Sequence, residues 1–141
     1  MKRLITYLFL VMSLSFSATN GADIYGKGEL KLYPRSVDYF IQYLKGGHDK
    51  APMMLILAKD QSFALFWYCP AGQGNCTPSN PAEYIKQCER KATSDCFIFA
   101  RNRTVRWKNG INPGKGKSSR FLSKWSREEI ETKLRELGFL Y

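Results

Sequence analysis

The sequence predicts an α+β domain: a small antiparallel sheet built from hairpins, packed against three helices and held by two disulfides. Two pairs of apolar, strand-like runs are each joined by a short polar turn, and three segments repeat apolar residues at helical spacing. Four cysteines, an even number in a small domain, indicate two disulfides. Strands joined mainly as hairpins, with helices packed on them, are typical of the α+β class.

The N-terminus has the pattern of a signal peptide. Lys2 and Arg3 precede an apolar run of about 13 residues, 4–16, and small residues follow it. The run is shorter than the roughly 20 residues that a spanning helix needs, which disfavours a retained membrane anchor. Cleavage after Ser17 and cleavage after Ala22 both leave small residues at the cut, and both sites stay open.

We therefore expect a signal peptide at residues 1–22 and a single disulfide-stapled domain at residues 23–141, periplasmic or secreted. That length allows one hydrophobic core. The net charge would fall from +10 to +8, because two basic residues leave with the signal and no acidic residue does.

The domain is expected to open with a strand and a helix. Residues 28–33 alternate leucines with polar side chains, which predicts a short strand. Ser36 can cap a helix that Gly46 and Gly47 end. Its apolar residues fall on one face: Val37, Phe40, Ile41 and Leu44.

The most apolar stretch, residues 53–69, is expected to form a β-hairpin. Turn formers at residues 59–62 divide it into two strand-like runs. Both runs are almost unbroken in hydrophobicity. We therefore expect central strands covered on both faces, or on one face and by the partner strand of the hairpin.

A loop at residues 70–79 leads into a second helix and a second hairpin. Asn80 is expected to cap the helix, with Pro81 at its first position and Glu83 returning a hydrogen bond to the cap. The hairpin joins residues 96–101 to residues 104–108. The packing residues expected in these elements are Ala82, Ile85, Cys88 and Ala92 in the helix, and Phe97, Phe99, Val105 and Trp107 in the hairpin.

Residues 109–119 lack periodicity and are expected to form an exposed, mobile loop.

The final helix is the best specified, since Ser126 can cap it and Glu129 can complete a capping box. Gly138 should end it, with Phe139 folded back on the last turn. The remaining expectations are a contact of Trp125 with Ile130, a buried stripe of Ile130, Leu134 and Leu137, and outer Glu129–Lys133 and Glu131–Arg135 pairs.

The cysteines allow three disulfide pairings. We favour the local one, Cys69 with Cys76 and Cys88 with Cys96, because each pair lies at the edge of one predicted turn. Each bridge would close about eight residues and stabilise the domain by about 2.5 kcal/mol. A zinc site is the competing interpretation. The spacings lack a C-x-x-C pair and the only histidine, His48, lies far upstream, so we predict no metal.

The sequence around Cys88 resembles a known arrangement. Cys88-Glu89, six residues, Cys96, three residues, Ala100, six residues and Trp107 is similar to a pattern in small exported proteins of proteobacteria, chiefly alphaproteobacteria. The segments 107–110, 114–116 and 137–139 resemble a subset of this family more closely. The resemblance implies export and the hairpin with paired cysteines, and it implies no activity.

Positive charge is concentrated in one segment. From Phe97 to Arg127 nine residues are basic and none is acidic. In the expected strand 104–108 the even-numbered residues share one face, while Val105 and Trp107 share the other. We predict that this segment binds anions through Arg101, Arg103, Arg106, Lys108, Lys115, Lys117 and Arg120.

The candidate partners are an anionic envelope polymer, a lipid headgroup or an envelope protein. Nucleic acid is disfavoured, because an exported protein seldom meets it. The competing interpretation is a solvated positive surface that keeps the domain soluble and prefers no ligand.

No residues match a catalytic motif, and no cofactor is expected. The Gly-Lys-Gly-Lys-Ser-Ser stretch at 114–119 lacks the glycine spacing of a phosphate-binding loop, although a backbone-lined anion site there stays open. His48 beside Asp49 could act as an acid or base, but there is no second histidine and no nucleophile motif. We therefore expect a non-enzymatic binding domain. The alternatives are a small envelope hydrolase and an inhibitor or accessory subunit.

Overall fold

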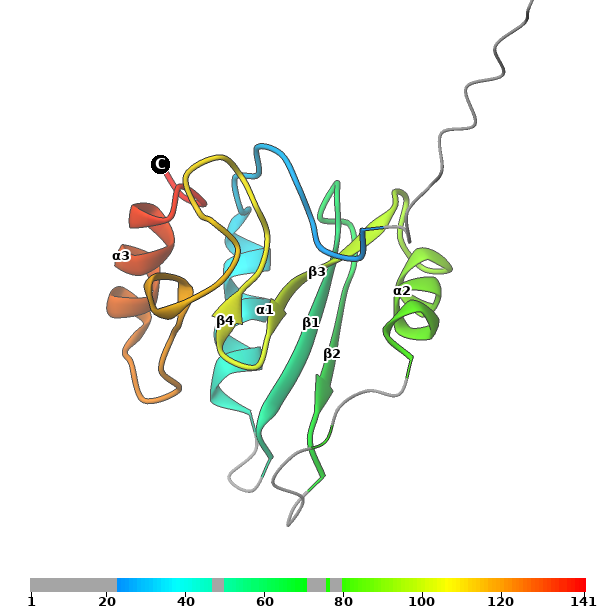
Figure 1. The fold of residues 1–141 in the computed structure, drawn as a ribbon, viewed down its shortest axis with the longest axis horizontal. Coiled ribbons are helices and arrows are strands. Elements are labelled where there is room, and N and C mark those ends of the chain that lie inside the picture. Colours follow the sequence, from blue (N-terminus) through cyan, green and yellow to red (C-terminus); the bar gives the residue numbers. More distant parts are fainter. Residues whose placement is uncertain (1–22, 47–49, 71–75, 77–79) are drawn as a thin grey trace, which may run out of the picture.

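The computed structural model describes residues 23–46, 50–70, 76 and 80–141. The signal peptide expected at residues 1–22 lies outside this part, as do Gly47, His48 and most of the loop 70–79. The described part has the predicted α+β architecture, with three α-helices and a four-stranded antiparallel sheet (Figure 1).

The strands are β1 (Pro52–Ala58), β2 (Ala64–Tyr68), β3 (Cys96–Arg101) and β4 (Thr104–Val105), and their order in the sheet is β2-β1-β3-β4. The helices are α1 (Pro34–Lys45), α2 (Pro81–Glu89) and α3 (Arg127–Glu136), with a short 3-10 helix, η1 (Lys117–Ser119). In the described ranges, no helix is long and apolar enough to cross a membrane.

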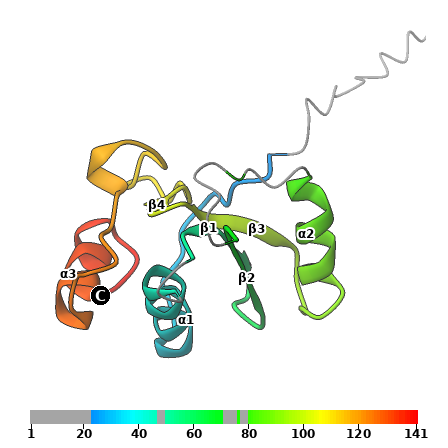
Figure 2. The same ribbon diagram turned by 90° about the horizontal axis from the view of Figure 1, so that it is seen from below.

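The sheet separates two apolar clusters, one on each face. Alternate residues of β1 enter different clusters, because successive side chains of a strand point to opposite faces. Leu55 and Leu57 join the cluster formed with α1 and α3, and Met54 and Ile56 join the cluster formed with α2. Figure 2 shows α1 and α3 together, with α2 across the strands from them.

The hairpin predicted at residues 53–69 is confirmed as the antiparallel pair β1–β2. The expectation of two central strands is right for β1, which pairs on both sides and is almost fully buried. It is wrong for β2, which is an edge strand of half-buried residues. Its apolar side chains pack on helices instead: Phe66 lies against Tyr39 of α1, and Trp67 lies 5.8 Å from the ring of Tyr84 in α2.

The strand predicted at residues 28–33 is wrong. The N-terminal segment pairs with the sheet further upstream, where Tyr25 and Lys27 form isolated parallel bridges with Ile98 and Lys108. The chain then turns at Gly28, whose φ is 94°. Leu30 and Leu32 are buried, but the Leu32 N–H bonds to the Phe139 carbonyl near the C-terminus rather than to a strand.

Gly26 makes the upstream pairing feasible. A Cβ atom at this position would lie 1.8 Å from an atom of the Trp107 ring, so the backbone passes directly over the indole. The indole N–H donates to the Gly28 carbonyl at 2.9 Å. The alternation of residues 28–33 therefore reflects burial of two leucines and not a strand.

Two of the predicted helix caps are corrected. α1 begins at Pro34 with Tyr33 as its N-cap, and Ser36 is a buried residue of the first turn. Asn80 is the N-cap of α2, but its side chain makes no capping bond, and α2 has no capping box with the Glu83 side chain; the Glu83 N–H donates to the Asn80 carbonyl. Both helices start with proline, whose fixed φ and missing N–H make a side-chain cap less necessary.

The predicted ends of the helices are better confirmed than their beginnings. Gly46 ends α1 with φ 41°. In α2, Cys88 is buried as predicted and Ala82 is exposed, contrary to the prediction.

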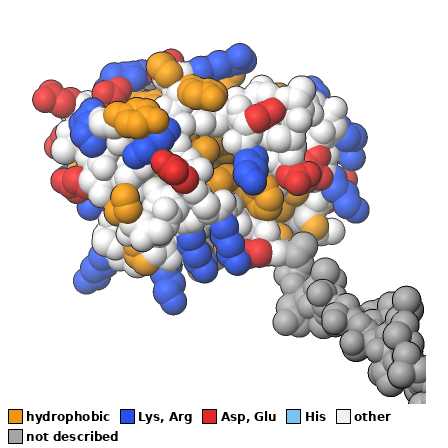
Figure 3. All heavy atoms as spheres, turned by 90° about the horizontal axis from the view of Figure 1, so that it is seen from above, with side chains coloured by type: hydrophobic (Ala, Val, Ile, Leu, Met, Phe, Trp, Pro, Cys, Tyr) orange, Lys and Arg blue, Asp and Glu red, His pale blue; other side chains and the backbone are white. Residues whose placement is uncertain are grey.

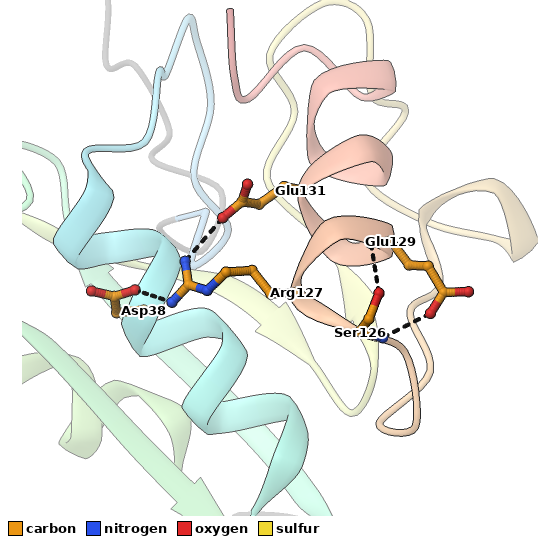
Figure 4. A network of polar contacts seen from close by, with 5 residues as sticks. All are labelled: Asp38, Ser126, Arg127, Glu129 and Glu131. Atoms are coloured by element: carbon orange, nitrogen blue, oxygen red, sulfur yellow. Dashed lines mark hydrogen bonds and ion pairs between the residues drawn. The ribbon is translucent and has the colours of Figure 1, made fainter.

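α3 follows its prediction closely. Ser126 Oγ accepts a hydrogen bond from the Glu129 N–H at 3.2 Å, and the Glu129 carboxylate accepts one from the Ser126 N–H at 2.7 Å (Figure 4). The stripe of Ile130, Leu134 and Leu137 is buried. Gly138 and Phe139 donate their N–H groups back to the last turn, at 3.0 and 2.9 Å, which is a Schellman motif.

The outer ion pairs predicted on α3 are wrong. The Glu129 carboxylate is held in the capping box. Arg127 pairs with Asp38 of α1 and with Glu131, and so links the two helices (Figure 4).

The segment 109–119 is exposed over most of its length, as expected, but it is anchored to the core at a few buried positions. Asn112 and Ser119 are buried, and Ser119 Oγ donates to Asn112 Oδ1 at 2.6 Å. Asn112 Nδ2 donates to the Trp107 carbonyl at 2.6 Å. These bonds tie the segment to the core, and η1 forms within it.

The local disulfide pairing is confirmed, with Cys69 bonded to Cys76 and Cys88 to Cys96.

The second hairpin is confirmed as β3–β4, but β4 ends at Val105, short of the predicted Lys108. The N–H groups of Arg106 and Trp107 both donate to the Phe99 carbonyl, which interrupts the regular ladder.

Candidate anion-binding pocket

A pocket of about 590 Å³ lies where β3 ends and β4 begins. Four of its lining residues are cations, and none is acidic. Their neighbours are small or polar residues and the first bridged cysteine pair. The lining consists of Arg101, Arg103, Arg106 and Lys115, with Ala51, Pro52, Met53, Cys69, Cys76, Asn102, Thr104 and Gly116.

An irregularity in β3 brings Arg101 to this pocket. Leu55 of β1 lies opposite Ala100, and the next residue, Ile56, lies opposite Ile98, so Phe99 is an extra residue in β3. The shift sets Arg101 opposite Met54, on the face that α2 covers. With regular alternation, Arg101 would point into the core of α1 and α3.

The turn after β3 brings Asn102 and Thr104 to the lining of the pocket. Arg101 pairs with Thr104, so these two residues share one face. Asn102 has φ 49°, a conformation that asparagine tolerates better than most residues. The hydroxyl of Tyr43, in α1, donates to the Asn102 carbonyl at 2.6 Å and so ties the turn to this helix. Burial raises the pKa of Tyr43 well above its ordinary value, so the hydroxyl keeps its proton.

Tyr25 positions two of the arginines. Arg101 Nη1 donates to the Tyr25 hydroxyl at 3.1 Å. The Arg106 guanidinium lies over the Tyr25 ring, 4.4 Å from its centroid, in a cation–π contact. Because the bridge to Ile98 ties the backbone of Tyr25 to β3, both guanidinium groups contact one side chain that is fixed to the sheet.

Arg103 and Lys115 are held by separate contacts. Arg103 Nε donates to Ser123 Oγ at 2.7 Å. Lys115 lies in the segment that Asn112 and Ser119 anchor, and its carbonyl faces the Ser119 hydroxyl at 3.3 Å.

The structure brings together some of the seven predicted residues and not others. Four line the pocket, and Arg120 lines an adjoining hollow of about 200 Å³ with Arg103 and Thr104. Lys108 and Lys117 are exposed and line neither. The predicted division of the strand is confirmed in burial, since Val105 and Trp107 are buried.

Sequence reasoning missed Tyr25 and Ser123. Both are single residues far in sequence from the arginines that they hold, and no spacing marks them. The neighbouring disulfide was predicted, but its position beside the cations was not.

Within the described residues, no carboxylate forms an ion pair with the four cations of the pocket. In the described part of the chain, the cations that form ion pairs are Lys27, Arg127 and Lys133, and none of these lines the pocket. Figure 3 shows lysine and arginine side chains projecting along the lower edge of the molecule in that view. Four unneutralised positive charges around one hollow create a strong local potential for an anion.

No protein-family model matches the chain. No curated protein and no solved structure matches it either.

Proposed function

We propose that this protein is a non-enzymatic, exported domain that binds an anionic component of the cell envelope in the pocket of Arg101, Arg103, Arg106 and Lys115. The observation that supports the proposal is that these four cations line one hollow of about 590 Å³, with no carboxylate among its described lining residues. That volume falls in the range of small-molecule sites, which is about 300–1,000 Å³.

Two physical arguments favour binding over a merely solvated surface. The three arginines are already ordered by contacts with Tyr25 and Ser123. A ligand therefore causes a smaller loss of side-chain entropy when it binds. Like charges held close together also repel, and an anion relieves that repulsion. A surface that served solubility alone would need neither feature.

The compartment belongs to the same proposal. The signal-peptide pattern at residues 1–22 and the two disulfides agree with an oxidising compartment outside the cytoplasm. There, lipid headgroups and acidic polymers present the negative charge that the pocket would meet.

A hydrolase is the weaker alternative. Among the described residues that line the pocket, none is a carboxylate or an imidazole that could act as a general acid or base. The one histidine, His48, lies outside the described residues.

The test compares two variants with the same loss of net charge. Arg103→Gln/Arg106→Gln removes two cations of the pocket, and Lys59→Gln/Lys86→Gln removes two exposed cations elsewhere. Binding to vesicles that contain phosphatidylglycerol, and to soluble polygalacturonate, is measured by sedimentation at low and high salt.

We expect salt-sensitive binding to at least one probe, lost in the pocket variant and kept in the control. Equal losses in both variants would contradict the proposal, because net charge and not the pocket would then explain binding. Failure of the unmodified domain to bind either probe at low salt would contradict it as well.

A further inference from the structure

The pocket obtains most of its positive charge from arginine. Each of its three guanidinium groups is planar and presents several N–H donors in a fixed fork, while the Lys115 ammonium is a compact point charge. The choice of arginine therefore concerns the geometry of the ligand as well as its charge.

Few of these N–H donors form side-chain hydrogen bonds within the described part of the chain. Arg101 gives one N–H to Tyr25 and Arg103 gives one to Ser123. Arg106 is held through the face of its guanidinium by the Tyr25 ring, which leaves the N–H edge of the group available. Within the described residues, none of the three forms an ion pair with a carboxylate.

Tyr25 keeps two of the forks apart. Its hydroxyl binds Arg101 and its ring face binds Arg106, so the two guanidinium groups approach the pocket from different sides of one aromatic side chain. Arg103 enters from the turn between β3 and β4 and is held by Ser123, which follows η1. The three guanidinium groups are thus held by two residues, Tyr25 and Ser123, through three different contacts.

A tetrahedral oxyanion suits this arrangement better than a carboxylate does. A phosphoryl group presents three oxygens in different directions, and each can accept from a separate fork. A carboxylate has two oxygens in one plane, which satisfy one fork and leave the others unpaired. Thr104 and Asn102, two neutral polar residues, also line the pocket.

We infer that the pocket selects phosphoryl groups over carboxylates, with Tyr25 as the residue that positions Arg101 and Arg106 for this selection. The inference rests on the proposed function and narrows its ligand to a phosphate ester, carried by a lipid or by a sugar.

The test measures affinity by calorimetry for inorganic pyrophosphate and for citrate, two anions of similar charge and different geometry. We expect pyrophosphate to bind at least about tenfold more tightly, because additional charge-assisted hydrogen bonds form. Equal affinity, or tighter binding of citrate, would overturn the inference.

Two variants separate selectivity from simple charge. Arg103→Lys/Arg106→Lys keeps the charge and removes two forks, so pyrophosphate should lose most of its advantage over citrate while salt-sensitive binding of both persists. Tyr25→Leu keeps every cation and removes both positioning contacts, and should lower the preference in the same direction. An unchanged preference in both variants would overturn the inference and leave the proposed function standing. The proposed function is tested separately, by whether Arg103→Gln/Arg106→Gln loses all anion binding while the control Lys59→Gln/Lys86→Gln keeps it.

The source of the phosphate is tested with two further probes. Vesicles that contain phosphatidic acid present the group on a lipid, and fructose 1,6-bisphosphate presents it on a soluble sugar. Binding of either probe more tightly than citrate supports the inference and identifies the source. Binding of neither more tightly than citrate overturns it.

Discussion

Replacing Asn112 with alanine tests whether the segment 109–119 is anchored as the structure shows. Asn112 is buried and makes two short hydrogen bonds, from its amide to the Trp107 carbonyl and from the Ser119 hydroxyl to its own oxygen, both at 2.6 Å. Each bond contributes about 1 kcal/mol net, and a buried partner left unsatisfied costs about 1–3 kcal/mol more. Allowing for partial relaxation, we expect Asn112→Ala to lower the free energy of unfolding by about 2–4 kcal/mol.

The assay is thermal unfolding of the oxidised domain, followed by circular dichroism. For a domain of this size each kcal/mol shifts Tm by about 4 °C, so the expected fall is about 8–16 °C. Lys117→Ala in the same segment is the control. Its side chain is exposed, and the change should stay within about 0.5 kcal/mol.

A double-mutant cycle identifies the bond responsible. Ser119→Ala removes the hydroxyl that Asn112 accepts from, so the two losses should not add, and a coupling of about 1 kcal/mol is expected. If Asn112→Ala costs no more than Lys117→Ala, the segment is not held by this network and the expectation of an exposed, mobile loop is right. Binding should also weaken in Asn112→Ala, because Lys115 loses its support.

Three further changes test other parts of the account. Gly26→Ala forces a Cβ atom into the Trp107 ring and should cost about 1–3 kcal/mol or more in thermal unfolding. Replacing both Cys88 and Cys96 with alanine should lower the free energy of unfolding by about 2.5 kcal/mol. In an unreduced digest of the unmodified domain, mass spectrometry should find Cys88 and Cys96 in one linked pair of peptides. Hydrogen bonds from Ser62, then from Thr93, hold the pKa of the Asp60 carboxyl below its usual range, so its stabilising contribution is complete above about pH 4 and is lost as the pH falls further. The difference in Tm between the unmodified domain and Asp60→Asn should therefore shrink between neutral pH and about pH 2.

Each of these changes has a control or a contradicting result. Lys27→Ala, at the exposed residue beside Gly26, should leave Tm almost unchanged. A linked peptide that joins Cys88 to Cys69 would contradict the observed pairing. A constant difference in Tm across pH would show that the Asp60 carboxylate does not need its charge to hold the β1–β2 turn.

The elements that the sequence predicts well are those whose signals are local. The capping box of α3 lies within Ser126–Glu129, and the glycine that ends the helix follows its last turn directly. The β1–β2 hairpin and both disulfides close over short stretches of chain. In each case the partners are close in sequence, so residue type and spacing are sufficient.

The errors arise where distant parts of the chain decide the outcome. Leu30 and Leu32 alternate like a strand, but the available sheet edge is taken further upstream because Gly26 can approach Trp107. Asn112 and Ser119 are residue types common in loops. Their role depends on the Trp107 carbonyl, which accepts from the Asn112 amide, while the Asn112 oxygen accepts from the Ser119 hydroxyl. These two polar residues form a buried network within a segment that is otherwise mostly exposed.

The candidate site was predicted in composition and not in shape. The concentration of basic residues identified Arg101, Arg103, Arg106 and Lys115, but it gave Lys108 and Lys117 equal weight. Selection among them depends on the extra residue at Phe99, which turns Arg101 away from the core, and on Tyr25, which lies 76 positions from Arg101. Neither feature has a pattern in the sequence.

The central claim is that anions bind in this pocket and not over the whole basic surface. It is tested most directly by titrating the isotope-labelled domain with inorganic pyrophosphate while the Nε–H and backbone N–H signals are followed by nuclear magnetic resonance. The account predicts saturable shifts of Arg101, Arg103 and Arg106, with smaller shifts around Lys115 and none at the exposed Lys59 and Lys86. Shifts spread evenly over all surface cations, or absent from the three arginines, would contradict it.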